Sequence, residues 1–399
     1  MKTIRAAVLI GAAALTLIVP TASSAAQSAT GSGTPPPAPA VDRFTALSVS
    51  LLAQPNPVVA ADGRLHLAYE LMMLNWTRFP ATLQRIEVLD ADRGNRVLAD
   101  FQGAALDAAA SSITQVPGRL VAPSAMHKAV LDVTLPRTAR PRTIVHRLTV
   151  TTEPVIDTLA SPFLAARATV ADRRPVVLAA PLRGPGWINL TGCCTPEAHR
   201  VVPQGLNGGL YLSQRFAYDT TKLAPDGRLL TGPVEDVTSY PAYGTPIHAV
   251  AAGTVVTAID GTPDRIPFNA PEPGEPESIS GNHVVLDIGG GRYAYFAHLK
   301  PGSVRVAVGQ RVRAGQQLGQ VGNSGNSDLP HVHFQIMDAP SPLASDGLPF
   351  VFRSFDSPGS IPPLEQIDVT GVIPVGPALR GHHELVSPMI LQVIDYPAV

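Results

Sequence analysis

The sequence predicts a mainly β protein, in which an N-terminal antiparallel β-sandwich is followed by a second, glycine-rich β domain. Forty prolines and thirty-four glycines interrupt the 399-residue chain every few residues, which favours short strands and turns over long helices. Between these breaks, apolar and polar residues alternate in short runs. Such alternation is typical of strands that bury one face.

Residues 1–26 have the composition of a secretory signal peptide. Two basic residues precede an apolar run over residues 6–19, and small residues near Ala26 suit a cleavage site. The run is too short to span a bilayer comfortably, so we expect no stable membrane insertion once the signal is cleaved. The signal peptide predicts that the protein is exported to the periplasm or the extracellular medium. Residues 27–42, rich in Gly, Ser and Pro, are expected to form a linker.

Residues 43–178 are predicted to form the antiparallel β-sandwich. Turn sequences such as "ADRGN" and "PRTARPR" separate five runs that alternate in the manner of strands. These runs are residues 44–52, 63–71, 83–91, 127–135 and 143–152. No catalytic group of side chains is apparent here, and the scattered histidines are expected to be ordinary strand residues. The sequence leaves the role of this domain open.

Residues 180–356 are predicted to form the glycine-rich β domain, and residues 357–399 a proline-rich tail that ends in one more strand. Cys193 and Cys194 are adjacent in this domain. An exported protein can oxidise its cysteines, but a bridge between neighbours closes a strained ring. The sequence therefore does not decide between a disulfide and two buried thiols.

The chain carries 30 basic and 31 acidic residues. This balance gives no electrostatic basis for binding nucleic acid or an anionic membrane surface. The oligomeric state is not indicated.

The stretch "DLPHVHFQI", residues 328–336, places two histidines one residue apart in a run that predicts a strand. Side chains at i and i+2 of a strand share a face, so His331 and His333 should stand side by side. Two such imidazoles can bind a metal together, or one can bind it while the other transfers protons. His298, at the end of another predicted strand, and Asp219, in "RFAYD", add further candidates.

From about residue 211 to residue 337 the chain resembles the lysostaphin-like zinc endopeptidases, also called LytM-domain proteins, which cut peptide cross-links in bacterial cell walls. Four stretches follow that family's pattern in order and with similar spacing: "GTPIHAVAAGTVV", "GNHVVLDIGGGRYAYFAHL", "VAVGQRVRAGQQLGQVGNSGNS" and "PHVHFQI". The resemblance implies a β domain of the barrel-sandwich-hybrid type, a bound Zn²⁺ and peptidoglycan peptide as substrate.

By this resemblance, Asp219 and His333 are zinc ligands, while His298 and His331 flank a zinc-bound water. Zinc lowers the pKa of its bound water from about 15.7 to roughly 7, so that a hydroxide can attack a peptide carbonyl. One imidazole would steer this water or take its proton. The other would stabilise the oxyanion or protonate the leaving amine.

Arg215 departs from the family pattern, because it stands where the family has its first ligand, a histidine four residues before the aspartate. A guanidinium stays protonated and offers a metal no lone pair, so we expect Arg215 to pair with Asp219. The third ligand is then unknown, with His199 and His283 as candidates. Replacing Arg215 by histidine should raise zinc affinity if the family's geometry survives, and no gain would indicate a rebuilt site.

Two functions follow from these features. The first is an exported zinc metalloendopeptidase that hydrolyses peptide bonds of peptidoglycan, and four retained family positions favour it. The alternative is a catalytically inactive LytM-type protein that binds cell wall or regulates other wall hydrolases. The sequence does not indicate which peptide bond would be cut.

Overall fold

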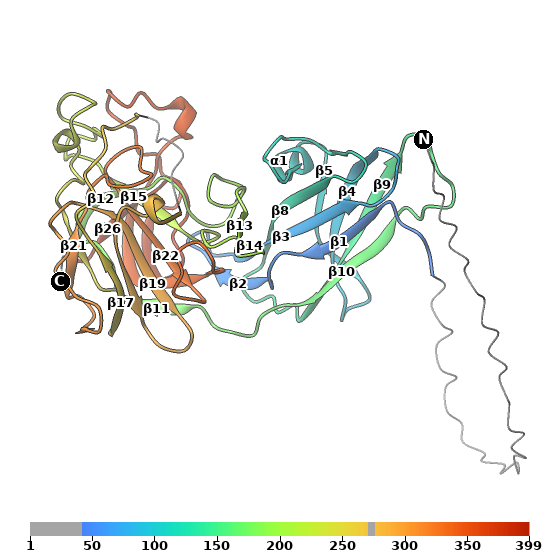
Figure 1. Ribbon diagram of the computed structural model, residues 1–399, viewed down its shortest axis with the longest axis horizontal. Helices are drawn as coiled ribbons and strands as arrows, with labels where there is room; N and C mark the ends of the chain where they lie inside the picture. The colour runs from blue at the N-terminus through green and yellow to red at the C-terminus, as the bar shows by residue number, and fades with distance from the viewer. Residues whose placement is uncertain (1–41, 270–275, 399) are drawn as a thin grey trace, which may run out of the picture. The chain divides into compact units, whose positions relative to one another are not determined.

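The computed structural model describes residues 42–269 and 276–398. The predicted signal peptide, and the predicted linker apart from its last residue, lie outside the described residues. The mainly β class is confirmed, because strands dominate the structure (Figure 1). The helices in the described ranges are short: α1 (Ala104–Ala109), α2 (Pro276–Ile279) and the 3₁₀ turns η1 (Val237–Ser239) and η2 (Leu364–Gln366). None of them is long and apolar enough to cross a membrane.

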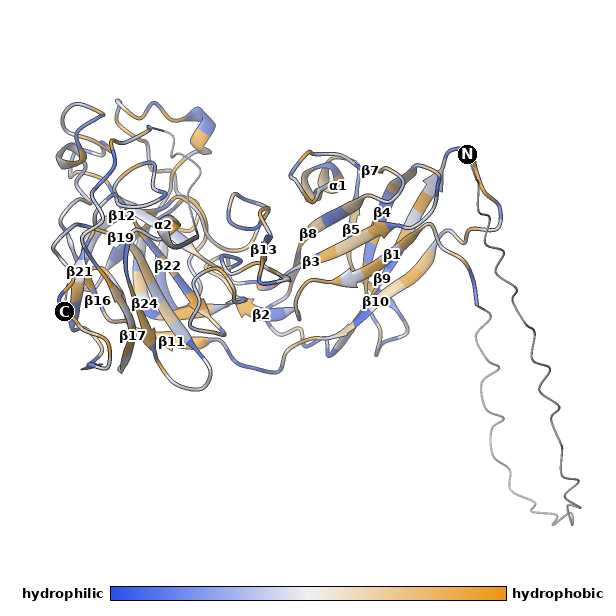
Figure 2. Ribbon diagram, in the orientation of Figure 1, coloured by the Kyte–Doolittle hydropathy of each residue, from blue (hydrophilic) through white to orange (hydrophobic). Residues whose placement is uncertain are grey.

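The first sheets form an antiparallel sandwich, and each of the five strand runs predicted between residues 44 and 152 contains a strand. One sheet contains β1 (Leu47–Leu51), β2 (Asn56–Val59), β3 (Leu65–Asn75), β6 (Ala110–Ser112) and β8 (Met126–Leu135). The other contains β4 (Ala81–Asp90), β5 (Arg96–Gln102), β7 (Leu120–Val121), β9 (Thr143–Thr152) and β10 (Phe163–Thr169). Hydrophobic residues are concentrated in strands such as β1, β3 and β10 (Figure 2).

Strand β3 is buried on both faces. Alternate residues such as Leu67 and Tyr69 lie in the sandwich core. Ala68, on the opposite face, belongs to the core of the second domain. The next residue on that opposite face, Glu70, is also buried. Because side chains alternate along a strand, β3 contributes to both cores at once.

The second domain is organised around a 12-stranded sheet. Its main path runs in the order β11 (Val176–Leu178), β24 (Phe350–Ser360), β26 (Gln392–Tyr396), β12 (Gly184–Asn189), β15 (Tyr218–Lys222), β22 (Val332–Met337), β19 (Tyr293–Leu299), β18 (Asn282–Asp287), β17 (Gly253–Ile259) and β20 (Arg311–Val312). β23 (Gly347–Leu348) pairs with β22, and β25 (Gly381–Val386) pairs with β24. Two small antiparallel sheets of two strands each complete the domain: β13 (Gln204–Leu206) with β14 (Gly209–Tyr211), and β16 (Pro246–His248) with β21 (Gln317–Gln320).

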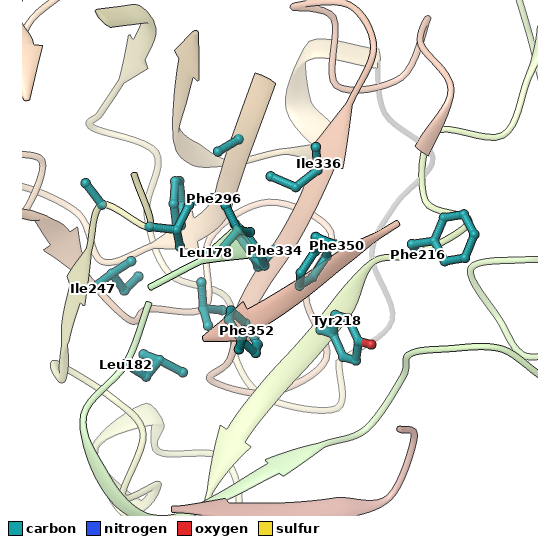
Figure 3. Packing of buried hydrophobic residues seen from close by; sticks show 14 of the residues in the cluster. Leu178, Leu182, Phe216, Tyr218, Ile247, Phe296, Phe334, Ile336, Phe350 and Phe352 are labelled. Atoms are coloured by element: carbon teal, nitrogen blue, oxygen red, sulfur yellow. The ribbon is translucent and has the colours of Figure 1, made fainter. Parts of the chain in front are cut away.

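An aromatic cluster packs beneath one face of this sheet. Figure 3 shows Phe334 and Ile336 of β22 near Phe350 and Phe352 of β24. The ring centroids of Phe334 and Phe350 are 4.9 Å apart. This packing fixes which face of β22 is apolar and therefore directs the histidines of the same strand to the other face.

The described part of the tail contains β25 and ends in β26, which lies between β24 and β12 in the large sheet. The prediction named only the terminal strand. The boundary predicted after residue 356 falls inside β24, where the pairing with β26 shifts register between Asp356 and Gly359. Pro358 and Gly359 lie at this irregularity within one strand.

Candidate metal centre

Three neighbouring strands bring the histidine pair and the aspartate together. In the antiparallel pairing of β15 with β22, Asp219 lies directly opposite His333. On the other side of β22, His333 faces Ala297 of β19, so His298 follows immediately. Val332 and Phe334 point into the core, which leaves His331 and His333 on the shared opposite face. The sheet register thus assembles residues separated by more than a hundred positions.

The carboxylate of Asp219 is surrounded by imidazoles. Its Oδ1 lies 2.8 Å from Nδ1 of His333 and 3.4 Å from Nε2 of His331. Its Oδ2 lies 3.1 Å from Nε2 of His199. The His199 and His333 rings are 4.9 Å apart between centroids. One donor atom each from His199, Asp219 and His333 lies within 4.8 Å of the others, so this trio could hold a single cation.

His199 reaches the aspartate from the loop that follows β12. The carboxylate of Glu197 accepts the backbone N–H of His199 at 3.0 Å, and the Glu197 carbonyl accepts the N–H of Arg200 at 2.9 Å. These bonds form a tight turn around His199. Earlier in the same loop, Cys193 and Cys194 are buried and paired as a disulfide.

His283, the other candidate third ligand, is placed differently. Its Nδ1 hydrogen-bonds the carbonyl of Gly281 at 2.8 Å, and its ring packs 5.8 Å from that of Tyr295. Within the described ranges, the donor group around Asp219 contains His199 and does not contain His283. The geometry therefore favours His199 as the third ligand.

The expected pairing of Arg215 with Asp219 is wrong. The guanidinium of Arg215 instead bonds the carboxylate of Glu70 at 2.8 Å and approaches Asp346 at 3.4 Å. Burial alone would lower the pKa of Arg215, but Glu70 and Asp346 raise it. The spacing of residues near Arg215 could not predict its pairing with Glu70, because Glu70 lies in a strand of the other domain.

His298 and His331 present equivalent nitrogens to the site. Nδ1 of His298 lies 2.8 Å from the carbonyl of Ser324, and Nδ1 of His331 lies 2.7 Å from that of Leu329. A carbonyl oxygen can only accept a hydrogen bond, so each neutral ring carries its hydrogen on Nδ1 and keeps a lone pair on Nε2. The ring centroids are 4.8 Å apart. His298 has a φ of 61°, a left-handed conformation that is uncommon outside glycine and clusters at functional sites.

The titration behaviour of the cluster reflects these contacts. Burial would raise the pKa of Asp219, but the imidazoles of His199 and His331 hold it well below its usual range. Burial would lower the pKa of His199, yet Asp219 raises it to about 9. Burial and the neighbouring His331 lower the pKa of His298 well below its ordinary value. The site therefore favours an ionised carboxylate beside a neutral His298.

The donor set suits zinc. Two imidazole nitrogens and one carboxylate oxygen are typical of zinc sites that keep a position for water. Ligands bound at about 2.0–2.2 Å in a tetrahedron lie about 3.3–3.6 Å apart, so the donor atoms now 2.8 and 3.1 Å apart around Asp219 would separate slightly on binding the ion. Gln335 adds support, because its Oε1, 2.8 Å from Nε2 of His333, accepts a hydrogen bond from an N–H there, which leaves the Nδ1 lone pair for a metal.

Gln335 was not among the residues singled out from the sequence. It lies two positions after His333, so the same alternation that paired the histidines places it on their face. Glu70 was also missed, and in that case no local pattern could have identified it.

A pocket of about 490 Å³ adjoins the cluster. Its lining contains Leu206, Asn207, Thr257, Ile259, Ser280, His283, Ser341, Pro342, Leu343 and Ala344. Gln335 connects it to the cluster, since its amide also donates to the Pro342 carbonyl at 3.2 Å. Tyr295 provides a second connection, with its ring 5.6 Å from His333 and 5.8 Å from His283. Among the lining residues in the described part of the chain, none is an aspartate, glutamate, lysine or arginine.

A second group of potential donors comprises His66, Asp132 and Cys194. Its histidine lies between two carboxylates, with Nδ1 3.0 Å from Asp132 and Nε2 3.1 Å from Asp62. These contacts raise the pKa of His66 despite its burial. The sulfur is committed to the bond with Cys193, so it offers no thiolate. This group is a buried ion-pair cluster.

Two histidines and one carboxylate that could hold a cation lie in this β domain, with two further imidazoles beside them. A family model described as Peptidase family M23 matches residues 237–345. The predicted lysostaphin-like resemblance is therefore confirmed for that part of the chain. The matched segment contains His298, His331 and His333, whereas His199, Arg215 and Asp219 precede it.

Curated relatives agree with this match. The glycyl-glycine endopeptidase ALE-1 of Staphylococcus capitis is 32% identical over 111 residues, which are 27% of this chain and 26% of the relative. Lysostaphin of Staphylococcus simulans is 31% identical over 152 residues, which are 37% of this chain and 23% of the relative. The chain thus spans about a quarter of the length of these relatives.

Two solved structures are also similar to parts of this chain. The catalytic domain of lysostaphin from Staphylococcus simulans is 23% identical, with 41% of this chain and 88% of that chain covered and a TM-score of 0.23. An M23 metalloprotease from the deep sea, pseudoalterin, is 15% identical, with 42% and 72% covered and a TM-score of 0.24.

Proposed function

We propose that this chain is an exported zinc metalloendopeptidase that hydrolyses peptide bonds of bacterial peptidoglycan. The observation that carries the proposal is the convergence of His199, Asp219 and His333 on one point, with His298 and His331 beside it. This set restores a three-ligand site in a chain that lacks the family's first histidine. The M23 match over residues 237–345 supports the reaction class.

Each side chain has a role that its contacts support. His199, Asp219 and His333 would hold Zn²⁺, which supplies a Lewis acid that activates water and polarises the peptide carbonyl. Gln335 orients His333 through its Nε2. His298 and His331, with Nδ1 bonded to backbone carbonyls, present Nε2 to the substrate, where one ring accepts a proton and the other donates a hydrogen bond or a proton.

The adjoining pocket indicates a peptide that carries uncharged side chains. Half of its lining residues are apolar, and burial lowers the pKa of His283, which keeps that ring neutral. Oligoglycine offers no side chain to fill such a space. The peptide next to the cleaved bond is therefore proposed to carry a small apolar side chain, since apolar area removed from water favours binding.

Filling this pocket should change substrate preference. Ala344→Trp is expected to lower kcat/KM at least tenfold for alanine-containing wall peptides and to leave the slow cleavage of oligoglycine unchanged. Mass-spectrometric assays on both peptides measure this, with Thr254→Trp, on β17 but outside the pocket lining, as the control. Faster cleavage of oligoglycine by the unmodified chain would contradict the assignment.

The proposed function is tested on the purified mature chain by metal analysis and by clearing of cell-wall suspensions. Stoichiometric zinc, clearing that a chelator stops, and recovery on adding zinc are the expected results. A chain that holds no zinc and clears no wall, yet enhances another wall hydrolase in the presence of chelator, would establish the inactive regulatory alternative instead.

A further inference from the structure

Glu70, in strand β3 of the sandwich, lies between two buried arginines of the second domain. Its Oε1 accepts a hydrogen bond from Nη2 of Arg200 at 3.0 Å, and its Oε2 accepts one from Nε of Arg215 at 2.8 Å. The side chains of Glu70, Arg200 and Arg215 are 1%, 0% and 2% exposed. All three charges are therefore removed from water.

The two arginines belong to the segments that supply the candidate zinc ligands. Arg200 directly follows His199, and Arg215 stands four residues before Asp219. One carboxylate from the sandwich is thus bonded to the His199 loop and to the approach to β15. His199 and Asp219 come from these two segments and meet at 3.1 Å.

Arg200 binds the His199 loop to the sandwich at several further points. Its guanidinium also donates to the carbonyl of Leu131 in β8 at 3.0 Å and to that of Tyr69 in β3 at 3.4 Å. A further bond reaches the carbonyl of Cys194 within the loop itself. Among the residues described, Glu70 is the only carboxylate paired with Arg200, so its loss leaves that guanidinium with neutral acceptors alone.

Burying a guanidinium is costly unless a carboxylate pairs with its charge. Without Glu70, Arg215 would keep Asp346 at 3.4 Å, whose side chain is 32% exposed. Arg200 would gain by moving toward water, and it would carry His199 with it. The separation between His199 and Asp219 therefore depends on a residue of the other domain.

We infer that Glu70 is a positioning residue of the metal centre, and that the sandwich is a structural part of the site. This inference rests on the proposed zinc site. It also accounts for Arg215: the position that holds the family's first ligand has become an anchor to Glu70, while His199, beside the second anchor Arg200, has taken the ligand position. The role of the sandwich, which the sequence left open, is then to hold these two segments together.

Zinc affinity is the measurement that tests the inference. Competition with a chromophoric chelator should show that Glu70→Gln and Glu70→Asp raise the Kd for zinc at least tenfold, since groups that orient metal ligands contribute roughly 10–100-fold. Glu70→Asp keeps the charge but is one methylene too short to reach both arginines. In the metal-free variants, amide hydrogen exchange over residues 195–203 should accelerate while that of β18 stays unchanged.

A matched control is available in the same sandwich. Glu87 is likewise a buried carboxylate that bridges two arginines, with Arg147 at 2.6 Å and Arg85 at 3.3 Å. All three residues lie in the sandwich. Glu87→Asp should therefore lower thermal stability as Glu70→Asp does, and leave the Kd for zinc within twofold of the unmodified chain.

Several outcomes would overturn the inference. One such outcome is a Glu70→Asp variant that folds and binds zinc with unchanged affinity. If both Glu70 variants fail to fold, amide hydrogen exchange in the unmodified metal-free chain tests the inference. Exchange of the Arg200 and Val201 amides as fast as in an open loop would refute the anchoring of this loop by Glu70. Arg215→His should give no gain in zinc affinity, and a gain would show that the position remains a ligand site. Absence of zinc from the unmodified chain would instead refute the proposed function itself.

Discussion

His199→Ala should abolish stoichiometric zinc binding and, with it, cell-wall clearing. The variant removes one of the three proposed ligands, so the loss should exceed the roughly 10–100-fold that orienting partners contribute to metal affinity. The remaining Asp219 and His333 lie 2.8 Å apart but offer zinc only two protein ligands. Metal analysis after dialysis against a weak chelator measures the effect.

The matched control for this prediction is His283→Ala. His283 is a buried histidine of the same domain, and it was the competing candidate for the third ligand. Its ring contacts Tyr295 and lies outside the donor trio, so its removal should leave zinc stoichiometry unchanged. The reverse pattern, with zinc lost from His283→Ala and retained by His199→Ala, would show that the loop does not supply the ligand.

His298→Ala and His331→Ala should each reduce kcat by about 10²–10⁴-fold while zinc stays bound. This loss corresponds to about 3–5 kcal/mol of transition-state stabilisation. Each ring is directed by a bond from Nδ1 to a backbone carbonyl, and neither is a member of the donor trio. Kinetics on a soluble wall peptide, together with metal content, separate this effect from metal loss.

His248→Ala provides the control for these two variants. His248 is equally buried, but it lies in β16 and its backbone N–H bonds the carbonyl of Pro181. Its loss should leave kcat unchanged. If His298→Ala and His331→Ala both retained full activity with zinc bound, proton transfer by these rings would be refuted.

Local patterns predicted much of the fold and part of the site. Alternation along "HVHFQI" placed His331 and His333 on one face, because the apolar face of β22 packs against Phe350 and its neighbours. Strand positions in the sandwich followed from alternation and turn residues in the same way. These features depend on neighbours within a few residues, which a sequence displays directly.

The rest of the site depends on contacts that local patterns do not encode. The choice between His199 and His283 requires knowing that the loop after β12 folds over Asp219. The expected pairing of Arg215 with Asp219 failed because Glu70, 145 residues away, offers a buried carboxylate. Strand β25 of the tail was missed for a similar reason, since its partner is β24.

The double burial of β3 has a consequence for engineering. Its odd-numbered residues fill the sandwich core, while Ala68 and Glu70 complete the opposite side. Excision of the second domain at residue 180 would expose the surface that packs against Ala68 and leave Arg200 and Arg215 without the carboxylate of Glu70. Joining this second domain to another sandwich should therefore require an acidic residue at the position of Glu70.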